Sequence, residues 1–198
     1  MVPQRICACL VIAACGVGLG WLSGAEPSRS TLVAQADPPS AKKKDEKVKV
    51  EAHLSVDKLP PGGECQVLIR LTVESGWHIN TNPAKPKEFV ATEITIIGKQ
   101  GTKLAELKYP KGKPMHIQDF DEDVWVYDGK VDVRGKLQVP AAAAGKSEDV
   151  DIIVKYQACD DKRCLLPATV KLTGKLPVAE SAADVKPVNA KLFPPESP

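Results

Sequence analysis

The sequence predicts an all-β protein, an immunoglobulin-like antiparallel β-sandwich with disordered, flexible N-terminal and C-terminal extensions. Apolar and polar residues alternate with a period of two in several runs, and the clearest are 48–56, 65–73 and 150–156. Such alternation marks strands with one buried face. Pro- and Gly-rich breakers separate the runs, and we find no amphipathic helix pattern and no internal repeat. Short strands with turn signals about ten residues apart favour a sandwich.

The first strand, 48–56, has Val and Leu on one face and Lys, Glu and Ser on the other. The second, 65–73, places Cys65 in the inward register, where the thiol is expected to act as a small buried hydrophobe. The strand 150–156 repeats the pattern and ends just before a cysteine pair. Further strands are expected at 89–97, 104–109, 124–127, 131–139 and 168–172, between the breakers LPPGGE, TNPAKPK, YPKGKP, YDGK and VPAAAAGK.

The N-terminus, 1–25, reads as an export signal. Arg5 supplies the positive start, 6–22 is apolar, and Ser-Gly-Ala at 23–25 offers a small-residue cleavage site. Two rival readings stay open: a lipoprotein box ending at Cys15, and an uncleaved anchor. The polar segment expected after a lipobox is missing, and the apolar stretch is at the lower limit for spanning about 30 Å of hydrocarbon. Export with cleavage to the periplasm is therefore favoured.

Two segments are expected to be flexible. Residues 26–47 are rich in Ser, Pro and charge, so they lack the apolar surface needed to fold and read as a linker. Residues 177–198 are Pro-rich and read as a tail. The folded domain is thus predicted to span 48–176. The whole chain carries 27 Lys and Arg against 25 Asp and Glu, which provides no basic field for nucleic acid.

Cleavage of the signal would leave three of the six cysteines, namely Cys65, Cys159 and Cys164. The last two flank a fully charged stretch, Asp-Asp-Lys-Arg, between two predicted strands, so they are expected to bracket a hairpin loop. A metal site is disfavoured because none of the three histidines has a ligand spacing to the pair. A structural staple and a redox couple both fit the spacing, and spacing alone does not decide between them.

Three stretches resemble one known family. YQACDDKRCLLPATVKL (156–172) is similar to the active-site strand of the N-terminal periplasmic domain of the thiol–disulfide interchange protein DsbD. ESGWHINTNPAKPKEFVATEI (74–94) and HIQDFDEDVWVYDGKVDV (116–133) resemble, in order, a strand pair and the cap region of that family. The likeness covers roughly 48–175.

The resemblance implies roles for particular residues. Cys159 and Cys164 would be the redox pair, and Phe120, with Asp119 beside it, would be the cap that shields the disulfide from stray thiols. His78 and Asn80 fall near positions where the family has tyrosines beside the disulfide, so they are candidates for proton handling. The alternative interpretation of His78, a satisfied surface histidine, is slightly favoured.

The sequence therefore favours a protein-disulfide reductase that relays reducing equivalents to periplasmic partners without a bound cofactor or metal. The family's membrane part and Cys-x-x-Cys domain have no counterpart in this sequence. By resemblance, the partners would be a separate membrane thiol reductase and thioredoxin-like periplasmic proteins. Contact with the membrane would occur only through an N-terminal anchor or lipid. The alternative is a non-enzymatic binding or scaffold module with a structural disulfide.

Overall fold

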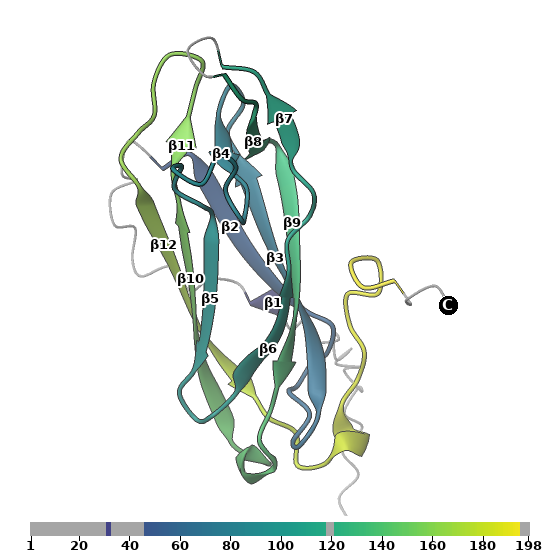
Figure 1. Cartoon of the computed structure of the whole chain (residues 1–198). Helices are drawn as coiled ribbons and strands as arrows, with labels where there is room; N and C mark the ends of the chain where they lie inside the picture. Colours follow the sequence, from purple (N-terminus) through teal and green to yellow (C-terminus); the bar gives the residue numbers. More distant parts are fainter. Residues whose placement is uncertain (1–30, 33–45, 118–120, 195–198) are drawn as a thin grey trace, which may run out of the picture.

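Strands dominate the protein in the computed structural model, which describes residues 31–32, 46–117 and 121–194 (Figure 1). Within these ranges the helical elements are two short 3-10 turns, η1 (Ala141–Ala143) and η2 (Ala182–Asp184). No helix of the described chain is long and apolar enough to cross a membrane. The predicted all-β class is confirmed.

The main sheet has eight antiparallel strands in the order β1-β2-β3-β9-β6-β5-β10-β12. It folds over on itself through β6, which pairs along β9 but meets β5 at a single position. The β2–β3–β9 part therefore faces the β5–β10–β12 part, as Figure 1 shows. The bounds are β1 (Thr31–Leu32), β2 (Val48–Leu54), β3 (Glu64–Val73), β5 (Glu93–Gly98), β6 (Lys103–Lys108), β9 (Lys130–Gln138), β10 (Ser147–Tyr156) and β12 (Ala168–Pro177).

The core lies between these two layers, and its residues come from alternate positions of the facing strands. Burial of this apolar surface is the main favourable term for the fold, at about 25 cal/mol per Å². Aliphatic side chains supply most of the core, and Tyr156 is its largest fully buried member. The expected burial of Cys65 is confirmed: the free thiol lies in the core, and burial raises its pKa to about 12.

A second, four-stranded sheet in the order β11-β4-β8-β7 closes one end of the sandwich. Its strands are β4 (His78–Asn80), β7 (Lys113–Met115), β8 (Val124–Tyr127) and β11 (Ala158–Cys159). Figure 1 shows this sheet at the top of the molecule, beyond β5 and β9. Because β11 contains Cys159, this small sheet is the part of the fold that positions the cysteine pair.

Each predicted strand is present, with shifted ends. The strand expected at 89–97 begins only at Glu93, and β10 and β12 each run to ten residues, longer than predicted. β1, β4, β7 and β11 were not predicted, because two or three residues carry no measurable periodicity.

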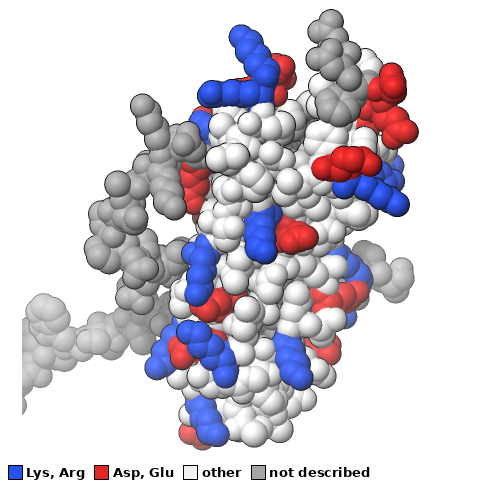
Figure 2. Space-filling model, turned by 60° about the vertical axis from the view of Figure 1, so that its left-hand side comes forward, with Lys and Arg blue, Asp and Glu red and all other residues white. Residues whose placement is uncertain are grey.

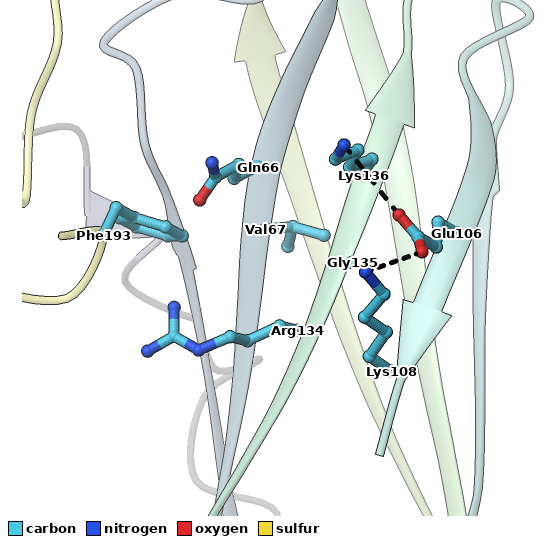
Figure 3. A pocket seen from close by; sticks show the side chains of 8 residues that line it. All are labelled: Gln66, Val67, Glu106, Lys108, Arg134, Gly135, Lys136 and Phe193. Carbon is cyan, nitrogen blue, oxygen red and sulfur yellow. Dashed lines mark ion pairs between the residues drawn. The ribbon is translucent and has the colours of Figure 1, made fainter. Parts of the chain in front are cut away.

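The segment after β12, predicted to be a flexible tail, contacts the sandwich in the described range. Val178 and Ala179 are buried, and the Val188 N–H donates to the Ser55 carbonyl at 2.8 Å. Farther along, the Arg134 guanidinium donates to the Leu192 carbonyl at 2.8 Å. Phe193 then lines a small hollow of about 80 Å³ on the outer face of β3 and β9, where Glu106 pairs with Lys108 and Lys136 (Figure 3).

A buried carboxylate holds the turn between β5 and β6. Glu148 is fully buried, and its two oxygens accept hydrogen bonds from the backbone N–H groups of Gln100 (2.6 Å) and Thr102 (3.0 Å). A Cβ at Gly98 would lie 2.5 Å from the Thr102 carbonyl oxygen, so only glycine allows this close approach. The Glu148 side chain of the neighbouring strand β10 thus helps to hold the turn, together with hydrogen bonds between Asp149 and residues 99–100.

We expect Glu148→Ala to lower the free energy of unfolding by about 2–4 kcal/mol, because both amides lose a charged acceptor. Urea denaturation followed by circular dichroism measures the change. Glu180→Ala removes an exposed carboxylate and should change stability by less than about 0.5 kcal/mol. Equal effects of the two substitutions would contradict the role assigned to Glu148.

Candidate functional site

The cysteine pair lies at the end of the longest hairpin in the described chain. β10 and β12 pair over ten residues, from Ser147 opposite Pro177 to Tyr156 opposite Ala168. Beyond Tyr156 the chain leaves the main sheet, forms β11, turns, and returns through Cys164 to Ala168. The predicted hairpin loop between the cysteines is therefore present.

Backbone hydrogen bonds close this hairpin independently of the sulfur atoms. The Asp160 N–H donates to the Arg163 carbonyl, and the Leu165 N–H donates to the Ala158 carbonyl, both at 2.9 Å. The side chain of Gln157 adds a third link by donating from Nε2 to the Leu165 carbonyl at 2.9 Å. Cys159 and Cys164 face each other between the two backbone bonds.

Asp160 shapes the four-residue turn. Its Oδ1 accepts hydrogen bonds from the N–H groups of Lys162 and Arg163, each at 2.8 Å. These bonds, first that from Lys162, favour the ionised carboxylate and hold its pKa below the usual range. The carboxylate thus forms an Asx-type turn, which holds the cysteines at opposite ends of a tight loop.

The two cysteines form a disulfide but have unequal surroundings. Their S–S distance is 1.98 Å and their Cα atoms are 4.0 Å apart. Cys159 is 3% exposed because β4 and the core cover it, whereas Cys164 is exposed. The disulfide thus joins one cysteine of the interior to one at the surface.

His78 lies directly beside the pair. In the small sheet it is opposite Cys159 in register, so the two side chains share one face of the sheet. It is 5% exposed, so it is not the surface histidine that remained one reading of the sequence. Loss of hydration lowers the pKa of its imidazole, and the carboxylates of Asp161, Asp128 and Asp160 oppose that shift in part. The imidazole is therefore held preferentially neutral.

Asn80 serves a different contact. It is 1% exposed, and its Nδ2 donates to the Val90 carbonyl at 2.9 Å, while its own carbonyl accepts from the Thr92 hydroxyl at 2.6 Å. These bonds tie β4 to the segment before β5. The side-chain amide of Asn80 is therefore bonded to the backbone of Val90. Through this bond Asn80 helps to hold in place β4, the strand that carries His78.

An open groove of about 460 Å³ begins at His78. It runs between the 73–77 turn, Asp128 and Gly129, with Met115 and Asp161 on its rim. Met115 ends β7, and the loop that follows leads into the predicted cap. Phe120 and Asp119 themselves lie outside the described residues.

The surface around the site carries mixed charge. Figure 2, which turns the β12 side toward the viewer, shows acidic and basic side chains close together with uncharged surface between them. The Lys113–Asp128 pair at 2.7 Å and the Arg163–Asp160 pair at 4.0 Å lie near the site. Among the described residues, no three His, Cys, Asp or Glu side chains form a group that could hold a metal ion.

Fold and site together define a class of protein: an immunoglobulin-like domain with a disulfide in a surface hairpin, one cysteine exposed and one buried. Residues 44–175 match the family model described as the N-terminal part of the thiol:disulfide interchange protein DsbD. The chain belongs to this family of DsbD N-terminal domains, which supports a role in thiol–disulfide interchange.

Several solved structures resemble the chain at low identity. The N-terminal periplasmic domain of ScsB from Proteus mirabilis is 14% identical, with a TM-score of 0.47, over 67% of this chain and 48% of that one. The reduced DsbD N-terminal domain of Neisseria meningitidis is 15% identical, with a TM-score of 0.40, over 64% and 86%. None of the curated proteins compared with the chain matches it in sequence.

A further similar structure is the complex between the DsbD N-terminal and PilB N-terminal domains of Neisseria meningitidis. It is 16% identical, with a TM-score of 0.40, and covers 73% of this chain and 91% of that one. The chain thus spans about half the length of the ScsB structure and most of the two Neisseria structures.

The burial of His78 predicts a pH dependence of stability. The folded state disfavours the imidazolium, while the unfolded chain binds a proton below about pH 6.5. The unfolded state then holds more protons, so stability falls as the pH drops below that value. We expect His78→Gln to show a smaller loss of stability between pH 7.5 and 5 in urea titrations.

His116→Gln is the matched control for this experiment, because it removes a histidine from an exposed position. The prediction is contradicted when the two variants show the same change in pH profile.

Proposed function

We propose that the protein relays reducing equivalents by thiol–disulfide exchange through the Cys159–Cys164 couple. In the reduced form, the Cys164 thiolate attacks one sulfur of a partner's disulfide, forms a mixed disulfide and displaces the partner's other sulfur as a thiolate. The Cys159 thiolate then attacks Cys164, which re-forms the Cys159–Cys164 bond and releases the partner as a dithiol. Two electrons pass to the partner, and no cofactor takes part.

The couple is regenerated by the reverse chemistry. A donor thiolate attacks Cys164, Cys159 leaves as a thiolate, and a second donor thiol resolves the mixed disulfide. By family resemblance, the donor is a separate membrane thiol reductase and the acceptors are thioredoxin-like proteins. The complex between the DsbD N-terminal and PilB N-terminal domains of Neisseria meningitidis supports protein partners for this family.

The unequal burial of the two cysteines carries this proposal. Attack on a disulfide requires a free path to one sulfur, and exposed Cys164 provides it while buried Cys159 does not. Burial of Cys159 also keeps the resolving thiol close to the mixed disulfide and away from other thiols. Cys164 is thus the attacking residue and Cys159 the resolving one.

His78 is well placed to act on the resolving step. A neutral imidazole accepts a proton, and His78 is both held neutral and opposite Cys159 in register. We assign to it the removal of the Cys159 thiol proton, which produces the thiolate that resolves the mixed disulfide. Asn80 supports this step indirectly, through its hydrogen bond to Val90.

The energetics favour a redox couple over a structural staple. A disulfide that closes so short a ring stabilises by only about 2 kcal/mol or less in the chain-entropy model. The β10–β12 ladder and the hydrogen bonds of the loop already hold the two ends together. In a scaffold module this disulfide would therefore add little to the free energy of unfolding.

The site of action proposed is the periplasm. The export signal (1–25) and nearly all of the linker (26–47) lie outside the described residues, apart from β1 and residues 46–47. Membership of a family with periplasmic relatives supports export. We propose that the signal is cleaved, and that the linker tethers the domain only when an anchor or lipid is retained.

Single cysteine variants test the division of roles. We expect reduced Cys159→Ser to accumulate a mixed disulfide at Cys164 with a protein disulfide, because nothing resolves it. Cys164→Ser should lose exchange, and its buried Cys159 should react with iodoacetamide at least tenfold more slowly than Cys164 does in the first variant. Alkylation followed by mass spectrometry gives both results.

Both variants should fold, since the backbone bonds of the hairpin remain. Unfolding of Cys159→Ser in circular dichroism, or a wild-type reduction potential below about −300 mV, would favour the structural staple and contradict the relay.

The cap is proposed from the family resemblance. Phe120, next to Asp119, is proposed to shield the disulfide from stray thiols and to move aside for the proper partner. Phe120→Ala should then raise the rate of disulfide reduction by dithiothreitol several-fold. Phe193→Ala, which truncates a phenylalanine beside the outer face of β3, is the control and should leave the rate unchanged. Equal rates in all three proteins would remove the cap assignment.

A further inference from the structure

The extended segment that carries Cys164 lies at an open edge. The small sheet ends at β11, whose one side pairs with β4, while its other side faces residues 164–165. No strand of the described chain pairs with the outer side of residues 164–166. Figure 1 shows this segment, between β11 and β12, along the left margin of the molecule. We call residues 164–166 the edge segment.

The hydrogen-bond pattern fixes which backbone groups of the edge segment point outward. Cys159 and Cys164 form a pair flanked by the bonds Asp160–Arg163 and Leu165–Ala158, which is the non-hydrogen-bonded pairing of an antiparallel ladder. In that pairing the N–H and C=O of Cys164 point away from β11. Leu165 points inward through both its N–H and its carbonyl, so the backbone of Leu166 points outward again.

Leu166 also presents an unusual side chain. It is 88% exposed, the highest value among the large hydrophobic residues of the described chain, where Ile97 reaches 46%. Leu165 between them turns inward and packs against the core. Cys164 and Leu166 therefore face outward together, two residues apart, about 6.6 Å along an extended chain.

Covalent geometry then places Leu166 in the interface of any complex made through Cys164. A mixed disulfide brings the partner's sulfur to about 2.05 Å from the sulfur of Cys164. The partner's surface around its own sulfur must therefore cover the residues that face outward beside Cys164, including Leu166. An apolar side chain here is costly in the free protein, since it meets water, and favourable once a partner covers it.

We propose that the edge segment is the docking strand for the thioredoxin-like protein partner, which pairs with the outward backbone groups of Cys164 and Leu166 and takes the Leu166 side chain into an apolar pocket beside its reactive cysteine. This inference rests on the proposed function, because it assumes exchange at Cys164. The backbone bonds orient the attacking sulfur, and the Leu166 pocket distinguishes a protein thiol from a small one. Leu166 is thus a specificity-determining residue that takes no part in the bond exchange.

Comparison of a protein reductant with a small one tests the proposal. Reduction of the Cys159–Cys164 disulfide is followed with reduced thioredoxin and with dithiothreitol, for the wild type, Leu166→Ser, Leu166→Met and Ile97→Ser. We expect Leu166→Ser to slow thioredoxin at least tenfold and dithiothreitol less than twofold, while Leu166→Met stays near wild type. Ile97→Ser is the matched control, since it removes an exposed apolar side chain from β5.

The outcomes separate this proposal from the relay itself. A disulfide that neither reagent reduces in the folded protein overturns the proposed function. Reduction by both reagents with no selective effect of Leu166→Ser leaves the relay standing and overturns the docking strand. A wild-type rate with thioredoxin no higher than with dithiothreitol also overturns it.

Amide exchange supplies an independent readout. In a trapped mixed disulfide between Cys159→Ser and a thioredoxin that lacks its resolving cysteine, the amides of Cys164 and Leu166 should become protected. The Leu165 amide is the internal control, because it already donates to Ala158 and should keep its protection. Unchanged exchange at Cys164 and Leu166 contradicts strand pairing.

Discussion

The ladder between β10 and β12 is the constraint on which the cysteine site depends. Ten consecutive residue pairs hold these strands in one register, so the chain must leave β10 and re-enter β12 at neighbouring points. The residues between Tyr156 and Ala168 therefore form a loop whose two ends are held next to each other. Two cysteines with four residues between them in that loop are brought face to face by backbone hydrogen bonds on either side of the pair.

This loop is held against the rest of the domain, because β4 pairs with β11 in its first half. This pairing buries Cys159 beside His78 and leaves the second half, with Cys164, bridged to the outer side of β11 at the edge of the small sheet. The asymmetry of the disulfide is thus a consequence of sheet order. A cysteine on an inner strand is shielded by neighbours on both sides, whereas a cysteine on an edge strand is shielded on one.

The sequence predicts the long strands well, because β2, β3, β9 and β10 each bury one face and alternate over seven or more residues. The short strands β4, β7 and β11 escape prediction, since they form through pairing between distant segments. The burial of His78 follows from one such pairing and has no local signal beyond the short alternation Trp-His-Ile-Asn. The exposure of Leu166 was not predicted for another reason. Two consecutive leucines do not show which of them is buried, and only the structure shows that Leu165 packs against the core while Leu166 faces outward.

The same arrangement separates the redox chemistry from the stability of the fold. Reduction of the bond removes one covalent link from a hairpin that keeps its backbone bonds, its Asp160 turn and its ladder. We therefore expect the reduced and oxidised forms to share one backbone framework, so that exchange in the proposed relay requires no refolding. A disulfide that bore the fold would couple each electron transfer to partial unfolding, and resolution by Cys159 would then wait for the chain to re-form. In the proposed relay the resolving cysteine, Cys159, lies in β11 directly opposite Cys164, where the mixed disulfide would form.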